Sequence, residues 1–205
     1  MRKKSHISLA KFLLDNIKEN KLIKHKKAFY IGSILPDLKP SFLTKRHTIE
    51  ETFDVLIKEI KKITVDYDVK KGISSYFARH LGVITHYLAD YCTLPHNSNY
   101  TGTIADHVYY EKEMKFQLKE YIEVDGIHSE AIKGQKLQTL DEIVQYITKT
   151  HNEYLMELKA IKKDIQYIIE LCSKVVDAIL TFLKMALDAL EGKPMHNFQL
   201  YEATE

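Results

Sequence analysis

Two pairs of histidine and carboxylate residues have a spacing that suits a metal ion. His86 and Asp90 are four residues apart in H-Y-L-A-D, and His107 and Glu111 have the same spacing in H-V-Y-Y-E. Residues four apart on an α-helix lie on one face, so both side chains of a pair can reach the same ion. One such pair is usually a surface contact that stabilises a helix. Two pairs with His96 between them are harder to explain in that way, and the pattern fits a metal site as well as it fits helix capping and surface hydrogen bonding.

The types of these residues indicate zinc and a catalytic role. Histidine and carboxylate are ligands that Zn²⁺ accepts besides cysteine. The sequence has two cysteines, Cys92 and Cys172, and neither belongs to the predicted set. Cysteine-rich zinc sites are usually closed and structural, whereas sites of histidine and carboxylate keep a position open for water. An open position of this kind is the arrangement of catalytic zinc sites.

Long helices have to position these side chains, because helical periodicity dominates the sequence and Gly and Pro are scarce. Thr48, Thr103 and Thr139 each stand three positions before an acidic residue, which is typical of a helix N-terminus. Pro36 should end a helix. We expect a first helix that begins after Ser5 and ends at Ile17, further helices at 22–34, 49–63, 73–92 and 103–122, and two more over 139–190. Polar connections are expected at 37–46, 97–102 and 125–134.

These elements predict an all-α fold, a bundle of about seven helices in a single domain over residues 1–205. The predicted donors place the metal site within residues 1–115. The C-terminal helices, 139–191, carry no motif.

The composition narrows the partners and the location. The formal net charge is +2, with acids interleaved among the lysines, so nucleic acid is the less favoured partner. No apolar run is long enough for a transmembrane segment. No signal peptide is evident, so we expect a cytoplasmic protein, with secretion as the alternative. The basic segments 2–4 and 24–27 are interpreted as solvated lysines, with transient contact with a membrane surface as the alternative.

The order of the candidate residues along the chain resembles the zinc-dependent phospholipase C family, which shares its helical fold with the P1/S1-type nucleases. That family has an early His, an Asp in a P-D loop and a His before a helix. It then has H-x-x-x-D, a His six residues on, and H-x-x-x-E. The matching residues are His6 in S-H-I-S-L-A, Asp37 in L-P-D, His47 in R-H-T-I-E, His86, Asp90, His96 in L-P-H-N, His107 and Glu111. The resemblance covers about residues 1–115 and implies a fold of the phospholipase C/P1 nuclease type.

The resemblance implies a set of zinc ligands. One ion would be held by Asp37, His47, His86 and Asp90, and a second by His96, His107 and Glu111. Asp90 would bridge to a third ion that also binds His6, and Asp37 would act as general base or orient the attacking water.

The third ion leaves an alternative open. In secreted members an amino-terminal Trp completes its site, and this sequence contains no Trp. The Met1 amine or solvent would take that place, or two ions would be bound instead of three.

The implied function is a zinc-dependent phosphoester hydrolase, which cleaves a phosphodiester in a phospholipid or another phosphoester substrate with metal-activated water. One alternative is a nuclease or phosphomonoesterase on the same site. The other is a non-catalytic helical protein that binds metal for stability.

Overall fold

The computed structural model describes residues 1–17, 19–38, 46–124, 136–157 and 159–193. These residues form eight α-helices and no strand, which confirms the predicted all-α class. The helices are α1 (Lys3–Asn16), α2 (Asn20–Lys24), α3 (Lys26–Ile34), α4 (Ile49–Lys61), α5 (Ser75–Tyr91), α6 (Ile104–Val124), α7 (Leu140–Met156) and α8 (Ile161–Leu190). Short 3-10 turns lie at η1 (Pro36–Leu38), η3 (Val69–Lys71) and η4 (Leu94–His96).

Three helices begin at the predicted caps. The Thr48 hydroxyl accepts a hydrogen bond from the Glu51 backbone N–H at 3.4 Å. Thr139 and Glu142 form a reciprocal capping box at the start of α7. The backbone N–H of Thr103 donates to the Asp106 carboxylate at 2.8 Å. These bonds satisfy N–H groups that a helix leaves unpaired at its start.

One predicted helix is divided. The segment 22–34 was expected to be continuous, but α2 ends and α3 begins at His25, where the backbone leaves the helical region (φ −105°, ψ 20°). The His25 imidazole Nδ1 hydrogen-bonds with Ser75 Oγ at 3.0 Å, at the start of α5. This contact joins residues far apart in the sequence, so a local pattern does not show it. The connections predicted at 37–46 and 125–134 fall largely outside the described residues.

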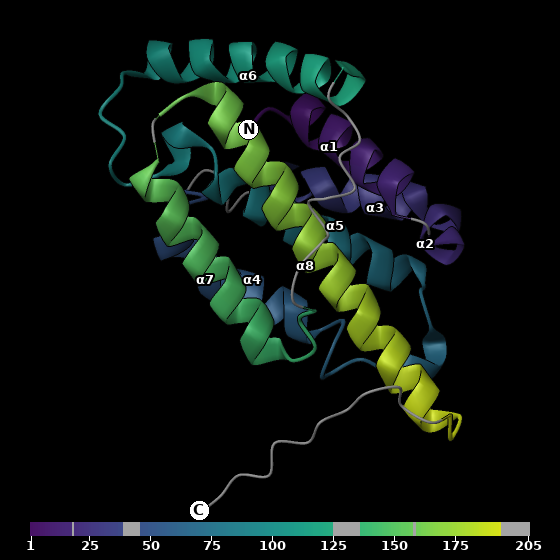
Figure 1. The fold of residues 1–205 in the computed structure, drawn as a ribbon. Helices are drawn as coiled ribbons and strands as arrows, with labels where there is room; N and C mark the ends of the chain where they lie inside the picture. The colour runs from purple at the N-terminus through teal and green to yellow at the C-terminus, as the bar shows by residue number, and fades with distance from the viewer. Residues whose placement is uncertain (18, 39–45, 125–135, 158, 194–205) are drawn as a thin grey trace, which may run out of the picture.

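Helix α5 lies at the centre and packs against α3, α4 and α8 (Figure 1). Every residue from Leu81 to Tyr91 is buried, as expected for a helix surrounded by others. Gly32 on α3 and Gly82 on α5 allow the closest approach. A Cβ atom at Gly82 would collide with the Phe29 carbonyl oxygen, and one at Gly32 with that of Arg79. This close contact holds the end of α3, and the turn that follows it, against α5.

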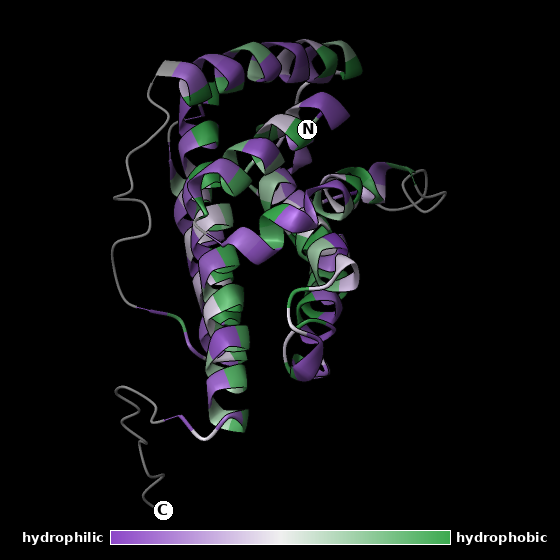
Figure 2. Cartoon of the chain, turned by 90° about the vertical axis from the view of Figure 1, so that its right-hand side faces the viewer, coloured by the Kyte–Doolittle hydropathy of each residue, from purple (hydrophilic) through white to green (hydrophobic). Residues whose placement is uncertain are grey.

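The remaining helices enclose α5 and its neighbours. Helix α8 packs against α5, α6 and α7, and α1 packs against α3 and α6. Helix α6 lies across one end of the molecule in both views (Figures 1 and 2). Among the described residues, no helix combines the length and the apolar character needed to cross a bilayer.

Candidate metal centre

The first group of candidate donors gathers around α5. His86 and Asp90 lie one turn apart on this helix, and His86 Nε2 is 3.2 Å from Asp90 Oδ2. His47, just before α4, places its Nδ1 3.0 Å from Asp90 Oδ2 and 2.9 Å from His86 Nε2. Asp37, in the turn after α3, places its Oδ1 3.6 Å from His86 Nε2 and 3.8 Å from His47 Nδ1. Four residues from three segments therefore converge on one point.

A hydrogen bond on the side of the ring away from the other donors fixes the orientation of His86. Its Nδ1 lies 2.9 Å from the Ser33 carbonyl oxygen, which can only accept a hydrogen bond, so the Nδ1–H is the donor. The other ring nitrogen, Nε2, then faces the group. Metal-bound histidines are commonly held in this way by a carbonyl behind the ring.

The second group lies between η4 and α6. His107 Nε2 is 3.4 Å from Glu111 Oε1, and His96 Nε2 is 3.9 Å from the same oxygen. The donor atoms of these three residues all lie within 4.8 Å of one another. His96 also connects the two groups, because its Nδ1 is 3.7 Å from Asp90 Oδ2.

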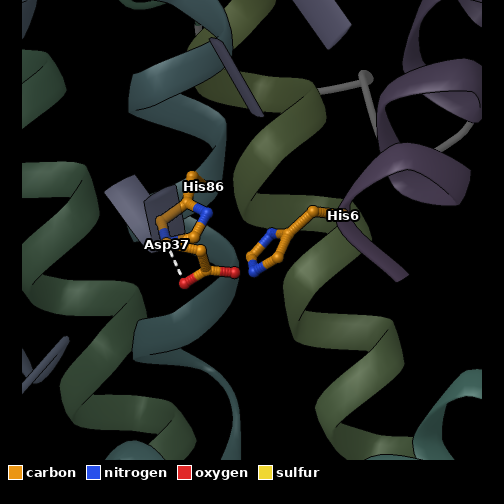
Figure 3. Close-up of side chains that lie close together, drawn as sticks. All are labelled: His6, Asp37 and His86. Atoms are coloured by element: carbon orange, nitrogen blue, oxygen red, sulfur yellow. Dashed lines mark ion pairs between the residues drawn. The ribbon is translucent and has the colours of Figure 1, made fainter. Parts of the chain in front are cut away.

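A third group involves the N-terminal end of the chain. Figure 3 shows His6 pointing from α1 toward Asp37 and His86, and its ring stacks on that of His86 with centroids 4.0 Å apart. The Met1 amino nitrogen is 2.6 Å from Asp90 Oδ1. His6 Nε2 is 3.3 Å from the same oxygen. The two oxygens of Asp90 thus face different groups, Oδ2 toward His47 and His86 and Oδ1 toward Met1 and His6.

The eight candidate residues differ in their access to solvent. Asp37, His47, His96, His107 and Glu111 line an open cleft of about 1290 Å³. His6, His86 and Asp90 lie beneath them and are almost fully buried. A molecule in the cleft can therefore contact five of the candidate residues, whereas the other three are buried beneath those five.

The donor set fits a divalent cation. Within the described residues, both ring nitrogens of the buried His6 lack a hydrogen-bond partner, and Nε2 approaches Asp90 without the geometry of a hydrogen bond. Burial lowers the pKa of His6 to about 3, so the ring is neutral and offers a lone pair. Burial alone would raise the pKa of Asp90, but His96, the Met1 amine and His86 hold it well below its usual range. Apart from the Met1 ammonium, which lies 2.6 Å from its Oδ1, the buried Asp90 carboxylate is surrounded by imidazole nitrogens, and carboxylate and imidazole are donors that suit a divalent cation such as zinc.

Asp164 on α8 supports the second group and was not among the predicted residues. Its buried carboxylate Oδ2 accepts a hydrogen bond from the Leu94 backbone N–H at 3.0 Å and another from the Tyr110 hydroxyl. Leu94 begins the turn that carries His96, and Tyr110 directly precedes Glu111. One carboxylate therefore holds both segments that supply the second group. Burial raises its pKa to about 6.

Comparison with known families agrees with this geometry. The family model described as zinc dependent phospholipase C matches residues 5–161. The chain therefore belongs to the zinc-dependent phospholipase C family, and its all-helical fold is of the phospholipase C/P1 nuclease type. The comparison with curated proteins gives no match, and the comparison with solved structures gives none either.

Proposed function

We propose that this chain is a zinc-dependent phospholipase C, which hydrolyses the bond between phosphate and glycerol in a phospholipid. The observation that carries the proposal is the convergence of three donor groups on one open cleft. A metal site of imidazole and carboxylate ligands beside an open cavity suits a catalytic role better than a structural one, because a coordination position stays free for substrate and water.

We assign the donors to two or three zinc ions. Asp37, His47, His86 and Asp90 would hold one ion, and His96, His107 and Glu111 a second. Asp90 Oδ1, His6 and the Met1 amine would hold the third. Bound zinc polarises a phosphoryl oxygen and lowers the pKa of a coordinated water.

The cleft supplies charge for the phosphate. Arg2, Lys3, Lys4 and Arg46 line its walls around the donor groups. Cationic side chains near a phosphodiester raise its local concentration and stabilise the charge that develops on its oxygens. The basic segment 2–4, interpreted from the sequence as solvated, thus has a role at the mouth of the site.

Asp37 is the residue best placed to accept a proton. It lines the cleft, where its carboxylate can accept a hydrogen bond from a water molecule beside the donor groups. In the proposed reaction a water oxygen attacks phosphorus and Asp37 takes a water proton. The phosphorus–oxygen bond to glycerol breaks, and the proton taken by Asp37 is passed on through solvent to the glycerol oxygen, which leaves as an alcohol.

The test is to measure bound zinc and activity on the same preparation. Protein purified without chelator is expected to contain two or three zinc ions and to release diacylglycerol from a short-chain phosphatidylcholine. Single-stranded DNA and p-nitrophenyl phosphate serve as competing substrates. Turnover of DNA or of the monoester alone would instead support the nuclease or phosphomonoesterase. Absence of zinc would refute the metal site.

A pair of variants separates catalysis from stability. His86→Ala removes a donor, whereas His25→Ala removes a histidine outside the donor groups and is the matched control. The proposal requires that His86→Ala loses zinc and activity while His25→Ala keeps both. If His86→Ala lowers the melting temperature and the wild type turns over no phosphoester, the chain is a non-catalytic metal-stabilised protein.

A further inference from the structure

Helix α6 exposes large apolar side chains beside the cleft. Ile104 is 86% exposed, Tyr109 67%, Phe116 53% and Val108 51%. The other exposed large apolar residues of the described chain are distributed over several other elements. In Figures 1 and 2 the outer side of α6 is free of any other described helix. Exposure of this extent on one helix indicates an interaction surface.

The charges on α6 are sorted around its axis. Tyr110, Met114 and Leu118, at spacings of four, form the stripe that is buried against the fold. Asp106, Glu113 and Glu120, at spacings of seven, form an acidic row on the side away from the cleft. Between the cleft and this row lies a surface that we name the α6 strip, which consists of Ile104, Val108, Tyr109, Lys112, Lys115 and Phe116.

Over residues 104–116 the α6 strip contains lysine and no acid, whereas Glu123, seven positions after Phe116, lies on the same face farther along the helix, with its Oε1 3.6 Å from Lys119 Nζ. Lys115 lies over the Phe116 ring, with its Nζ 5.0 Å from the ring centroid. The strip continues into the basic start of the chain, because the Arg2 guanidinium donates a hydrogen bond to the Val108 carbonyl oxygen at 3.1 Å. Arg2 and Lys115 both line the cleft, together with Ile104 and Val108. The strip therefore continues into the part of the cleft lining that carries Arg2, Lys3 and Lys4, while Glu50 and Glu51 on α4 line another part of the cleft.

This combination fits a lipid surface better than a protein. Lysine is depleted at the cores of protein interfaces, where its charge would be buried. At a bilayer, a lysine places its aliphatic stem among the acyl chains and its ammonium group beside the lipid phosphates. Exposed aromatic and aliphatic residues enter the same interfacial layer.

We propose that the α6 strip docks on an anionic phospholipid bilayer and turns the cleft mouth toward the lipid headgroups. The docking extends the proposed function, since it places the cleft where a phospholipid would enter, but binding is measured without hydrolysis. Each lysine near an anionic surface contributes roughly a fivefold gain in partition coefficient, and insertion of two aromatic side chains contributes about tenfold.

The test is co-sedimentation with unilamellar vesicles of phosphatidylcholine, with and without one fifth phosphatidylglycerol. The variant Tyr109→Ser/Phe116→Ser removes apolar residues of the strip that are absent from the cleft lining. Ile31→Ser/Leu190→Ser removes two residues of similar exposure, 53% and 55%, from α3 and α8. We expect the wild type and the control to bind anionic vesicles, and the strip variant to bind about tenfold more weakly.

Two further measurements decide between explanations. Hydrolysis of a monomeric short-chain phospholipid is expected to be equal in the wild type and the strip variant, while hydrolysis of vesicle lipid falls in the variant. Equal vesicle binding by both, or a wild-type dimer that the strip variant converts to a monomer, would overturn the docking proposal. Vesicle binding without hydrolysis of any phospholipid would support docking and refute the proposed function.

Discussion

Replacing Asp164 with Asn should change how the stability of the protein depends on pH. The carboxylate is 1% exposed, and burial raises its pKa from the usual 3.8 to about 6. An acid whose pKa is higher in the folded state holds its proton more tightly there. The free energy of unfolding therefore falls as the pH rises from the pKa that the carboxyl has in the unfolded chain through its pKa in the folded protein. A pKa that is about 2 higher in the folded state lowers the free energy of unfolding by about 3 kcal/mol between about pH 4 and pH 7.

Asn cannot titrate, so the Asp164→Asn variant lacks this loss. Urea unfolding of chelator-treated protein at several pH values from about 4 to about 7.5 measures the free energy of unfolding. From the lower to the higher pH, the free energy of unfolding of the variant should increase by about 3 kcal/mol relative to that of the wild type. Asp54→Asn, at an exposed carboxyl on α4, is the control for removing one charge. If the free energy of unfolding varies with pH in the same way in the wild type and in Asp164→Asn, the carboxyl of Asp164 is not buried as described, and the reasoning is refuted.

Other expectations follow from the same geometry. His107→Ala should lose about one zinc per chain by elemental analysis and leave the other ions bound, because His107 belongs to the second donor group alone; loss of all zinc would contradict this. Chelation should lower the melting temperature by about 6–12 °C if zinc contributes about 3 kcal/mol, as calorimetry would show; an unchanged melting temperature would exclude a stabilising ion. Gly82→Ala should lower the free energy of unfolding by about 1–3 kcal/mol in urea, because α3 must move away. A dipeptide added before Met1 moves the amino group away from its carboxylate and should reduce zinc content, whereas the same dipeptide at the C-terminus should not.

The fold was largely readable from the sequence because its signals are local. The threonine caps at 48, 103 and 139 and the break at Pro36 lie at helix ends in the structure. The division between α2 and α3 was not predicted, since the contact of His25 with Ser75 depends on how α5 packs.

The candidate donors were readable to different degrees. The pairs His86 with Asp90 and His107 with Glu111 follow from helical spacing alone. His6, Asp37 and His47 required the family resemblance, because no local pattern links residues on different segments. The structure gathers all of them near one cleft, whereas zinc ligation itself stays a prediction.

Asp164 shows what sequence reasoning missed and how it could be found. It lies four positions before Ile168 and seven before Leu171, so it shares the buried face of α8 with apolar residues. An acidic residue on such a face must have buried partners. The presence of partners is thus predictable, but their identity is not, because Leu94 and Tyr110 come from distant parts of the chain.

The position of Asp164 also has a consequence for the order of assembly. During synthesis every candidate donor leaves the ribosome before α8 does. The turn of His96 and the start of α6 then lack the carboxylate that joins them. The two segments of the second donor group would be joined only when α8, the last described helix, folds back, so a nascent chain that already contains every candidate donor would still lack this support.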